Sequence, residues 1–145
     1  MGKTTKTIFL SLSVLVIIGA IIALYMFNKE GPDIKNSTAA KVAATDLYET
    51  FSKDSAAAKM MHTEKILEVS GEVAQLTKNQ QNQAIILLKT FTGGASINCT
   101  MEGAATNIKQ GDKILIKGIC NGLGQGDADL GIAPDVYLSR CYIVP

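Results

Sequence analysis

The sequence predicts a mainly β soluble domain that follows a single N-terminal transmembrane helix. Three observations lead to this prediction: a long apolar run near the N-terminus, a change to two-residue hydrophobic periodicity after Lys65, and turn residues that recur between short apolar segments. The 145 residues suffice for one domain and an appendage.

The apolar run extends from Ile8 to Phe27 and contains no charged residue. A helix of this length spans about 30 Å, the thickness of the hydrocarbon core of a bilayer, and satisfies its own backbone polar groups there. A secretory signal has a shorter apolar run and a cleavage site between small residues, whereas this run ends in bulky side chains. We therefore expect an uncleaved signal anchor in the lipid bilayer, with a removed signal peptide as the alternative.

The charges on either side of the apolar run predict its orientation. Two lysines and the N-terminal amine precede the run without any acidic residue, whereas the lysines that follow it are balanced by acidic residues. The positive-inside rule places the more cationic side in the cytoplasm. We therefore expect a cytoplasmic tail over residues 1–7, a single-pass span of a bacterial cell membrane over residues 8–27, and a soluble part that faces the periplasm or the exterior.

Two segments connect the expected anchor to the β domain. Residues 28–37 contain a Gly-Pro-Asp turn and are polar, which is typical of a juxtamembrane linker. Residues 38–63 are expected to be helical, because an Ala-rich run follows Ser37 and Thr38, either of which could cap a helix. Asp54 or Ser55 is the candidate cap for a second short helical turn over residues 56–61 in the same segment.

Five strands are expected between residues 64 and 145. Turn residues or Gly-rich loops separate them. They are Lys65–Leu76, Ala84–Thr90, Ala95–Glu102, Lys113–Cys120 and Val136–Val144. Gly71 indicates a bulge or bend in the first strand. A bent first strand, a connector before the fourth strand and a long loop before the fifth are the element order of an OB-fold barrel, with an open five-stranded sheet or another small barrel as the alternative.

Three segments of this domain carry a resemblance to a known family: Lys65–Val73, Gly111–Gly122 and Asp135–Val144. They resemble the first strand, the fourth strand with its turn, and the last strand of the tRNA_anti-like OB-fold family, small and largely uncharacterised bacterial proteins that are often secreted or membrane-tethered. The resemblance covers roughly residues 47–144. It implies likeness in fold to anticodon-binding domains, and fold does not fix function. His62 departs from the family pattern, in which Tyr is expected.

The charge balance argues against a nucleic-acid ligand. From residue 64 to residue 145, seven cationic side chains stand against eight acidic ones. A single-strand binder combines a cationic groove with aromatic side chains on which bases stack, and the aromatic residues here are only Phe91, Tyr137 and Tyr142. The two tyrosines have opposite parity along the last strand, so we expect one of them to point inward.

The function expected from these features is that of a non-catalytic, extracytoplasmic binding or interaction module. An oligosaccharide, a peptide or an envelope protein would suit the barrel as partner. The alternatives are a single-stranded nucleic-acid-binding protein and an accessory subunit of an envelope complex. The candidate ligand face lies on the last two strands and comprises Lys113, Lys117, Tyr137 and Arg140.

No enzyme, cofactor or metal site is expected. His62 is the only histidine, so one chain cannot build a His-based triad or a multi-His metal site. Three acidic residues near the last strand, Asp127, Asp129 and Asp135, could hold calcium through oxygen ligands, but their spacing favours a polar turn. The Gly-x-Gly-x-Gly pattern that starts at Gly122 lacks the helix and the lysine of a phosphate-binding loop.

The three cysteines, Cys99, Cys120 and Cys141, all lie in the soluble part. Cys120 and Cys141 flank the final hairpin asymmetrically and would lie about 20 Å apart, too far for a disulfide bond. The third and fifth strands of an OB barrel are neighbours, so Cys99 and Cys141 are the candidate pair in an oxidising compartment. Three buried free thiols are the alternative.

Overall fold

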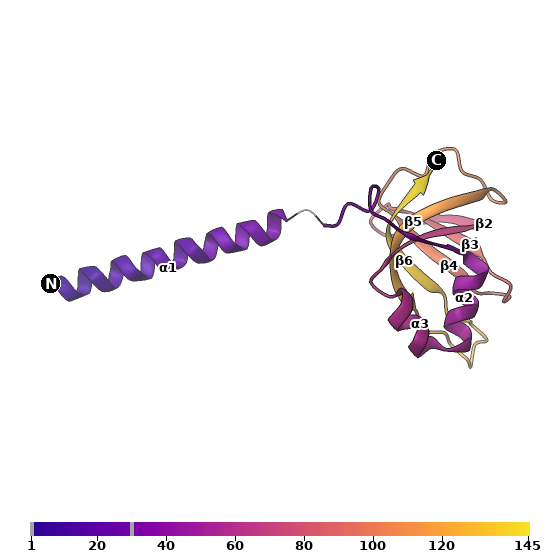
Figure 1. The fold of residues 1–145 in the computed structure, drawn as a ribbon, viewed down its shortest axis with the longest axis horizontal. Helices are drawn as coiled ribbons and strands as arrows, with labels where there is room; N and C mark the ends of the chain where they lie inside the picture. The colour runs from indigo at the N-terminus through magenta and orange to yellow at the C-terminus, as the bar shows by residue number, and fades with distance from the viewer. Residues whose placement is uncertain (1, 30) are drawn as a thin grey trace. The chain divides into compact units, whose positions relative to one another are not determined.

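The computed structural model of the protein describes residues 2–29 and 31–145. The chain forms two compact units, Met1–Asp33 and Ile34–Pro145. The first unit contains the helix α1, Lys3–Asn28, and the second contains the strands and two short helices (Figure 1).

Helix α1 is long and apolar enough to cross a membrane. The most apolar 18-residue stretch of the candidate span Lys6–Asn28 has a mean hydropathy of 2.8, and none of that stretch is buried in the protein. The hydroxyl of Ser11 donates a hydrogen bond to the backbone oxygen of Ile8 at 2.9 Å, and that of Ser13 donates to Phe9 at 2.8 Å. These polar side chains are therefore satisfied within the helix, as an apolar environment requires.

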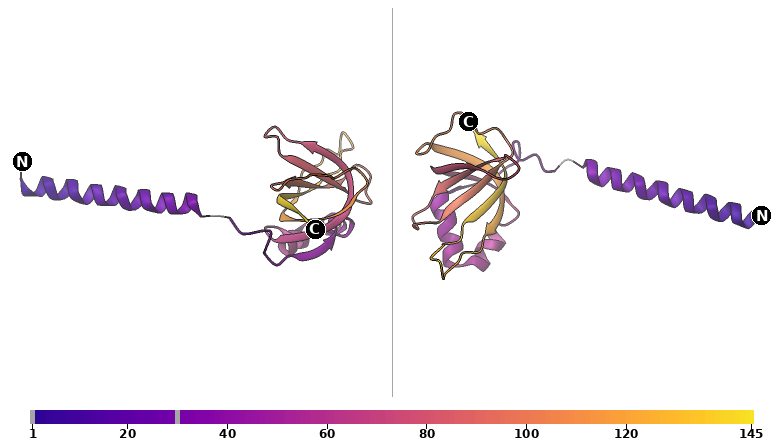
Figure 2. Two further views of the ribbon diagram at one scale, coloured as in Figure 1. Left: turned by 90° about the horizontal axis from the view of Figure 1, so that it is seen from above. Right: turned by 180° about the vertical axis from the view of Figure 1, so that it is seen from behind.

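Five strands of the second unit close into a barrel. The strands are β2 Ile66–Lys78, β3 Ala84–Lys89, β4 Ser96–Met101, β5 Lys113–Leu123 and β6 Val136–Val144. They follow the order β2-β3-β4-β6-β5, and a further pairing of β2 with β5 closes the ring (Figure 2). All pairs are antiparallel except β4 with β6, which is parallel. This is the strand order of an OB-fold, so the predicted mainly β class and barrel are confirmed.

The predicted helical segment, residues 38–63, begins with a strand and not with a helix. Strand β1, Ala40–Ala43, pairs in parallel with Leu67–Ser70 of β2. It occupies an edge of β2 that β3 leaves free, and the backbone pairing there outweighs the helix propensity of its alanines. Ser37 and Thr38 therefore cap no helix.

Two helices follow β1 directly. Helix α2, Ala44–Lys53, has no side-chain cap. Helix α3, Ser55–His62, is capped by Asp54, one of the two predicted candidates, which accepts a hydrogen bond from the backbone N–H of Ala57 at 3.0 Å. Helix α2 contacts β1, β2, β3 and β4, and buries Leu47 and Phe51 in the core. It thereby fills the barrel end at which β1 terminates.

Gly71 permits a close approach of the chain and does not form the expected bulge. The irregularity of β2 lies further on, between Val73 and Gln75. A Cβ atom at Gly71 would lie 3.0 Å from the Cβ of Ala44 and 3.2 Å from the Cβ of Leu88. The absence of a side chain therefore lets α2 and β3 pack against β2 where its pairing changes from β1 to β3.

Candidate binding surface

The four residues of the predicted ligand face do not form one site. Gly122 of β5 pairs with Tyr137, so Tyr137 lies at the end of the β5–β6 pair opposite to Lys113. At about 3.3 Å per residue, these two side chains are separated by about 30 Å along the strand. A small ligand cannot contact both of them.

A bulge at Arg140 changes which residues of β6 face outward. Arg140 has a φ of 53° and lies at the shift in register between β5 and β6. Leu138 and Cys141 are both buried, so two inward positions are three residues apart where a regular strand would place them two apart. Tyr137 is 41% exposed, and Tyr142 lies outside the buried core. The expectation that one tyrosine points inward was wrong for this reason.

The other two cations of the predicted face are engaged by the protein itself. Lys117 donates a hydrogen bond from Nζ to the backbone oxygen of Lys35 at 3.1 Å. The Nζ of Lys35 in turn lies 4.8 Å from the ring centroid of Tyr142. Arg140 donates from Nε to Glu102 at 2.8 Å, and this hydrogen bond is the main cause that lowers the pKa of Glu102.

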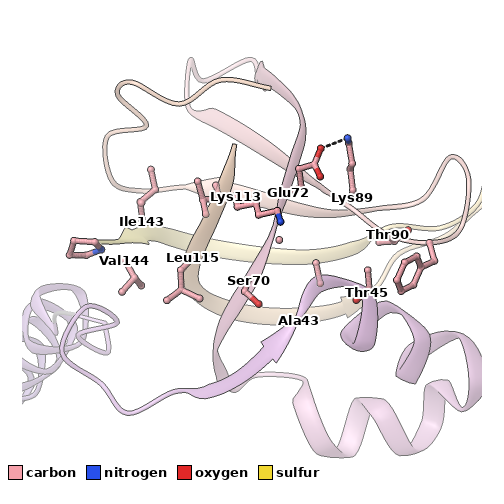
Figure 3. A pocket seen from close by; sticks show the side chains of 15 residues that line it. Ala43, Thr45, Ser70, Glu72, Lys89, Thr90, Lys113, Leu115, Ile143 and Val144 are labelled. Carbon is pink, nitrogen blue, oxygen red and sulfur yellow. Dashed lines mark hydrogen bonds and ion pairs between the residues drawn. The ribbon is translucent and has the colours of Figure 1, made fainter. Parts of the chain in front are cut away.

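A hollow lies over β2, and we call it the β2 trough. It has a volume of about 930 Å³ and lies where β1 and β3 both end (Figure 3). Its lining residues come from β1 and α2, from β2, from β3 and the turn after it, from β5, and from the end of the chain. They are Ala43, Ala44, Thr45, Ser70, Gly71, Glu72, Lys89, Thr90, Phe91, Lys113, Ile114, Leu115, Ile143, Val144 and Pro145.

Three charged side chains line one wall of the β2 trough. Lys89 forms an ion pair with Glu72, and Lys113 stands opposite Glu72 in the register of β2 with β5 (Figure 3). The hydrogen bond and the charge of Lys89, with a smaller contribution from Lys113, lower the pKa of Glu72. Among the described residues, Lys113 makes no hydrogen bond and no ion pair, so its ammonium group is available to a ligand.

Of the predicted face, only Lys113 belongs to the β2 trough. No local sequence pattern links Lys113 to the other polar and aromatic residues of the trough, Ser70, Glu72, Lys89 and Phe91. One available signal was Phe91, an aromatic residue just before a Gly-Gly turn, whose side chain is 89% exposed. The trough itself depends on where β1 ends, and the sequence analysis placed a helix at that position.

The acidic residues before β6 stabilise their own loop. Asp127 accepts hydrogen bonds from the backbone N–H groups of Asp129 at 3.0 Å and Leu130 at 3.1 Å. Asp135 accepts one from Ser96 at 2.8 Å, which ties the loop to β4. No group of three potential metal ligands occurs within residues 2–29 and 31–145.

His62 is a packing residue at the end of α3. Its ring centroid lies 6.1 Å from that of Phe51, and the two rings are tilted by 45°. Partial burial, and then the charge of Lys65, lower the pKa of His62 below its usual value. The imidazole is therefore neutral at pH 7 and packs against the aromatic core.

Cys99 and Cys141 lie on neighbouring strands, as predicted. In the β4–β6 register, Cys99 is opposite Leu138, and after a shift Met101 is opposite Cys141. Both thiols are buried and are not joined by a bond in the structure, and a side-chain hydrogen bond with Cys141 is the main cause that raises the pKa of Cys99 well above its usual value. Their disulfide remains a prediction.

The tRNA_anti-like family model matches residues 2–129 of the sequence. The chain belongs to the tRNA_anti-like family. The match includes helix α1 and the segment that carries β1, which the predicted range of residues 47–144 omitted. It ends before β6, so the resemblance seen in Asp135–Val144 lies outside it. The OB-fold characteristic of tRNA_anti-like proteins is a binding domain, and the barrel agrees with it.

Comparisons with individual proteins give little information beyond the family membership. No curated protein matches the sequence. Among solved structures, a putative aspartyl-tRNA synthetase from Leishmania major Friedlin is similar with 9% identity and a TM-score of 0.45, over 86% of this chain and 25% of that one. This tRNA_anti-like chain thus spans about a quarter of that protein, and a likeness at this score carries no argument about function.

Proposed function

We propose that this tRNA_anti-like protein is a membrane-anchored, extracytoplasmic binding module and not an enzyme. One observation carries the proposal: an OB barrel, which is a binding fold, follows in the same chain a helix that is apolar enough to cross a membrane. The charge asymmetry around α1 supports an outward-facing barrel. The partners proposed are the bilayer through Ile8–Phe27 and an oligosaccharide, peptide or envelope protein in the outer compartment of a bacterial cell.

The side chains with chemical reactivity support a non-catalytic role. His62 packs against the ring of Phe51, and burial and the charge of Lys65 lower its pKa. Burial raises the pKa of Cys120, and the hydrogen bond with Cys141 raises that of Cys99. A thiol acts as a nucleophile only as thiolate, so these raised pKa values disfavour a catalytic thiolate at neutral pH.

The contacts that the lysine and arginine side chains make within the barrel argue against single-stranded nucleic acid as the ligand. Phosphate contacts dominate the affinity of proteins for nucleic acid. Lys89 and Arg140 form ion pairs with acidic residues, and Lys117 binds a backbone oxygen. Among the described residues, three of the seven barrel cations are thus engaged by the protein itself, which reduces the positive charge available to a phosphate backbone.

The anchor is tested by washing membranes from cells that produce the full chain with alkaline carbonate. We expect the protein to stay in the membrane pellet with α1 uncleaved, which the intact mass of the purified protein reports. Replacing both Leu15 and Ile18 by Arg should release it, since each central arginine costs about 2.5–3.5 kcal/mol of insertion free energy. Leu130→Arg, in the exposed loop before β6, is the matched control and should leave retention unchanged. Release of the unmodified protein, or a mature chain that begins after Phe27, would contradict the anchor.

A further inference from the structure

We propose that the β2 trough binds an amphipathic anion, a small molecule with an apolar body and one carboxylate or phosphate group. The inference rests on the proposed function, since it names the ligand class of the binding module. The β2 trough combines a hollow of about 930 Å³ with the ammonium group of Lys113, which makes no hydrogen bond and no ion pair among the described residues.

The walls of the β2 trough suit an apolar body. Leu115 and Val144 are neighbours in the β5–β6 register and line one side (Figure 3). Phe91 lies in the turn after β3 and is 89% exposed. An aromatic side chain held in water at the rim of a hollow is the typical contact for a flat or aliphatic ligand surface.

The charges of the β2 trough select for a single negative group. Lys89 and Lys113 stand against Glu72, which leaves one positive charge in excess on this wall. Lys89 already forms an ion pair with Glu72, so the ammonium group of Lys113 is the one that can bind the ligand's negative group. A neutral sugar gains little from such an ammonium group, whereas a carboxylate or phosphate accepts charge-assisted hydrogen bonds from it. Ser70 adds a hydroxyl group to the lining of the trough.

The β2 trough results from the fold and not from a chance gap between side chains. Strand β1 pairs with β2 as far as Ser70, and β3 begins to pair at Val73. At Gly71 and Glu72 neither strand covers that edge of β2, because both end there. The opening is therefore framed on three sides by backbone, and its volume of about 930 Å³ lies within the range of small-molecule sites.

The probe for this site is 4-benzoylbenzoate, an aromatic carboxylate that forms a covalent bond to nearby C–H groups under ultraviolet light. The full chain in detergent is irradiated with the probe, and the modified residues are mapped by peptide mass spectrometry. Mapping by residue separates labelling of the trough from labelling of α1, which detergent surrounds. The uncharged methyl ester of the same acid is the matched probe.

We expect the acid to modify residues 113–115 and 143–145, and Lys113→Met to reduce this labelling about tenfold, the effect of losing one charge-assisted contact. Glu72→Gln should increase the labelling, because it frees Lys89. Lys78→Met, at the far end of β2, should change nothing. The methyl ester should label the trough equally in the wild-type chain and in Lys113→Met.

Three results would overturn the proposal. The first is labelling by the acid that does not depend on Lys113. The second is that inorganic phosphate displaces the acid as effectively as 4-phenylbenzoate does. That result would show an anion site without an apolar part. The third is displacement by a fifteen-residue oligothymidylate at similar concentration, which would indicate nucleic acid, roughly the length a single OB-fold accommodates. The carbonate wash is independent of all three, so failure here leaves the anchor standing.

Discussion

Gly118→Ala is expected to lower the free energy of unfolding by about 3 kcal/mol, the upper range for overpacking a core. A Cβ atom at Gly118 would lie 2.5 Å from the Sγ of Cys141 and 3.1 Å from the backbone oxygen of Ser139. Cys141 is buried, and Ser139 belongs to the β5–β6 pairing, so neither atom can move away without disturbing the barrel. Urea denaturation of the full chain, followed by tyrosine fluorescence, measures the effect.

Two variants control this prediction. Gly93→Ala lies in a turn where a Cβ atom would meet nothing within 4 Å, and it should change stability by less than about 0.5 kcal/mol. Adding Cys141→Ala to Gly118→Ala should cost less than the sum of the two single variants, because it removes the sulfur that the new methyl group meets. Equal stability of Gly118→Ala and Gly93→Ala would show that β5 and β6 do not pack as described.

A Cys99–Cys141 disulfide is expected when the chain is exported, and its reduction should lower stability by about 4 kcal/mol in the chain-entropy model. The two thiols lie on adjacent strands and share a hydrogen bond. Each loses a proton, and the two electrons pass to a disulfide donor of the oxidising compartment, such as oxidised glutathione or a thiol-oxidising enzyme. The bond would join β4 to β6, which pair only in parallel.

The state of the cysteines is read by alkylating the unfolded, unreduced protein and mapping the modified peptides. Only Cys120 should carry the alkyl group in protein isolated from the membrane. Cys99→Ala should leave Cys141 alkylated and should remove the stabilisation, whereas Cys120→Ala should preserve the bond. Three alkylated cysteines in exported protein would show that the buried thiols stay reduced.

Hydrophobic periodicity was sufficient to predict the five barrel strands and their order. The alternation from Ile66 to Val73 agrees with the burial of Leu67 and Val69. Periodicity was not sufficient to predict β1. Its four residues have no strand preference of their own, and they form a strand because they pair with a free edge of β2. Local propensity favoured a helix there, and tertiary pairing overrode it.

The site was harder to predict than the fold, for two physical reasons. Strict alternation along β6 predicts that Tyr142 points inward, and the bulge at Arg140 reverses its parity. Charge counting also treats the cations as equivalent, whereas the fold pairs Arg140 and Lys89 with acidic residues and leaves Lys113 without a hydrogen bond or ion pair among the described residues. Whether a cation forms an ion pair depends on residues from distant strands, and a local sequence pattern does not identify those residues.

The central claim, a binding module held outside the cell membrane, is tested most directly by fusing reporters after Pro145. Alkaline phosphatase is active only where its disulfides form, and β-galactosidase is active only in the cytoplasm. The account predicts an active phosphatase fusion and an inactive galactosidase fusion in cells that produce the full chain. An active galactosidase fusion with an inactive phosphatase fusion would place the barrel in the cytoplasm and contradict the account.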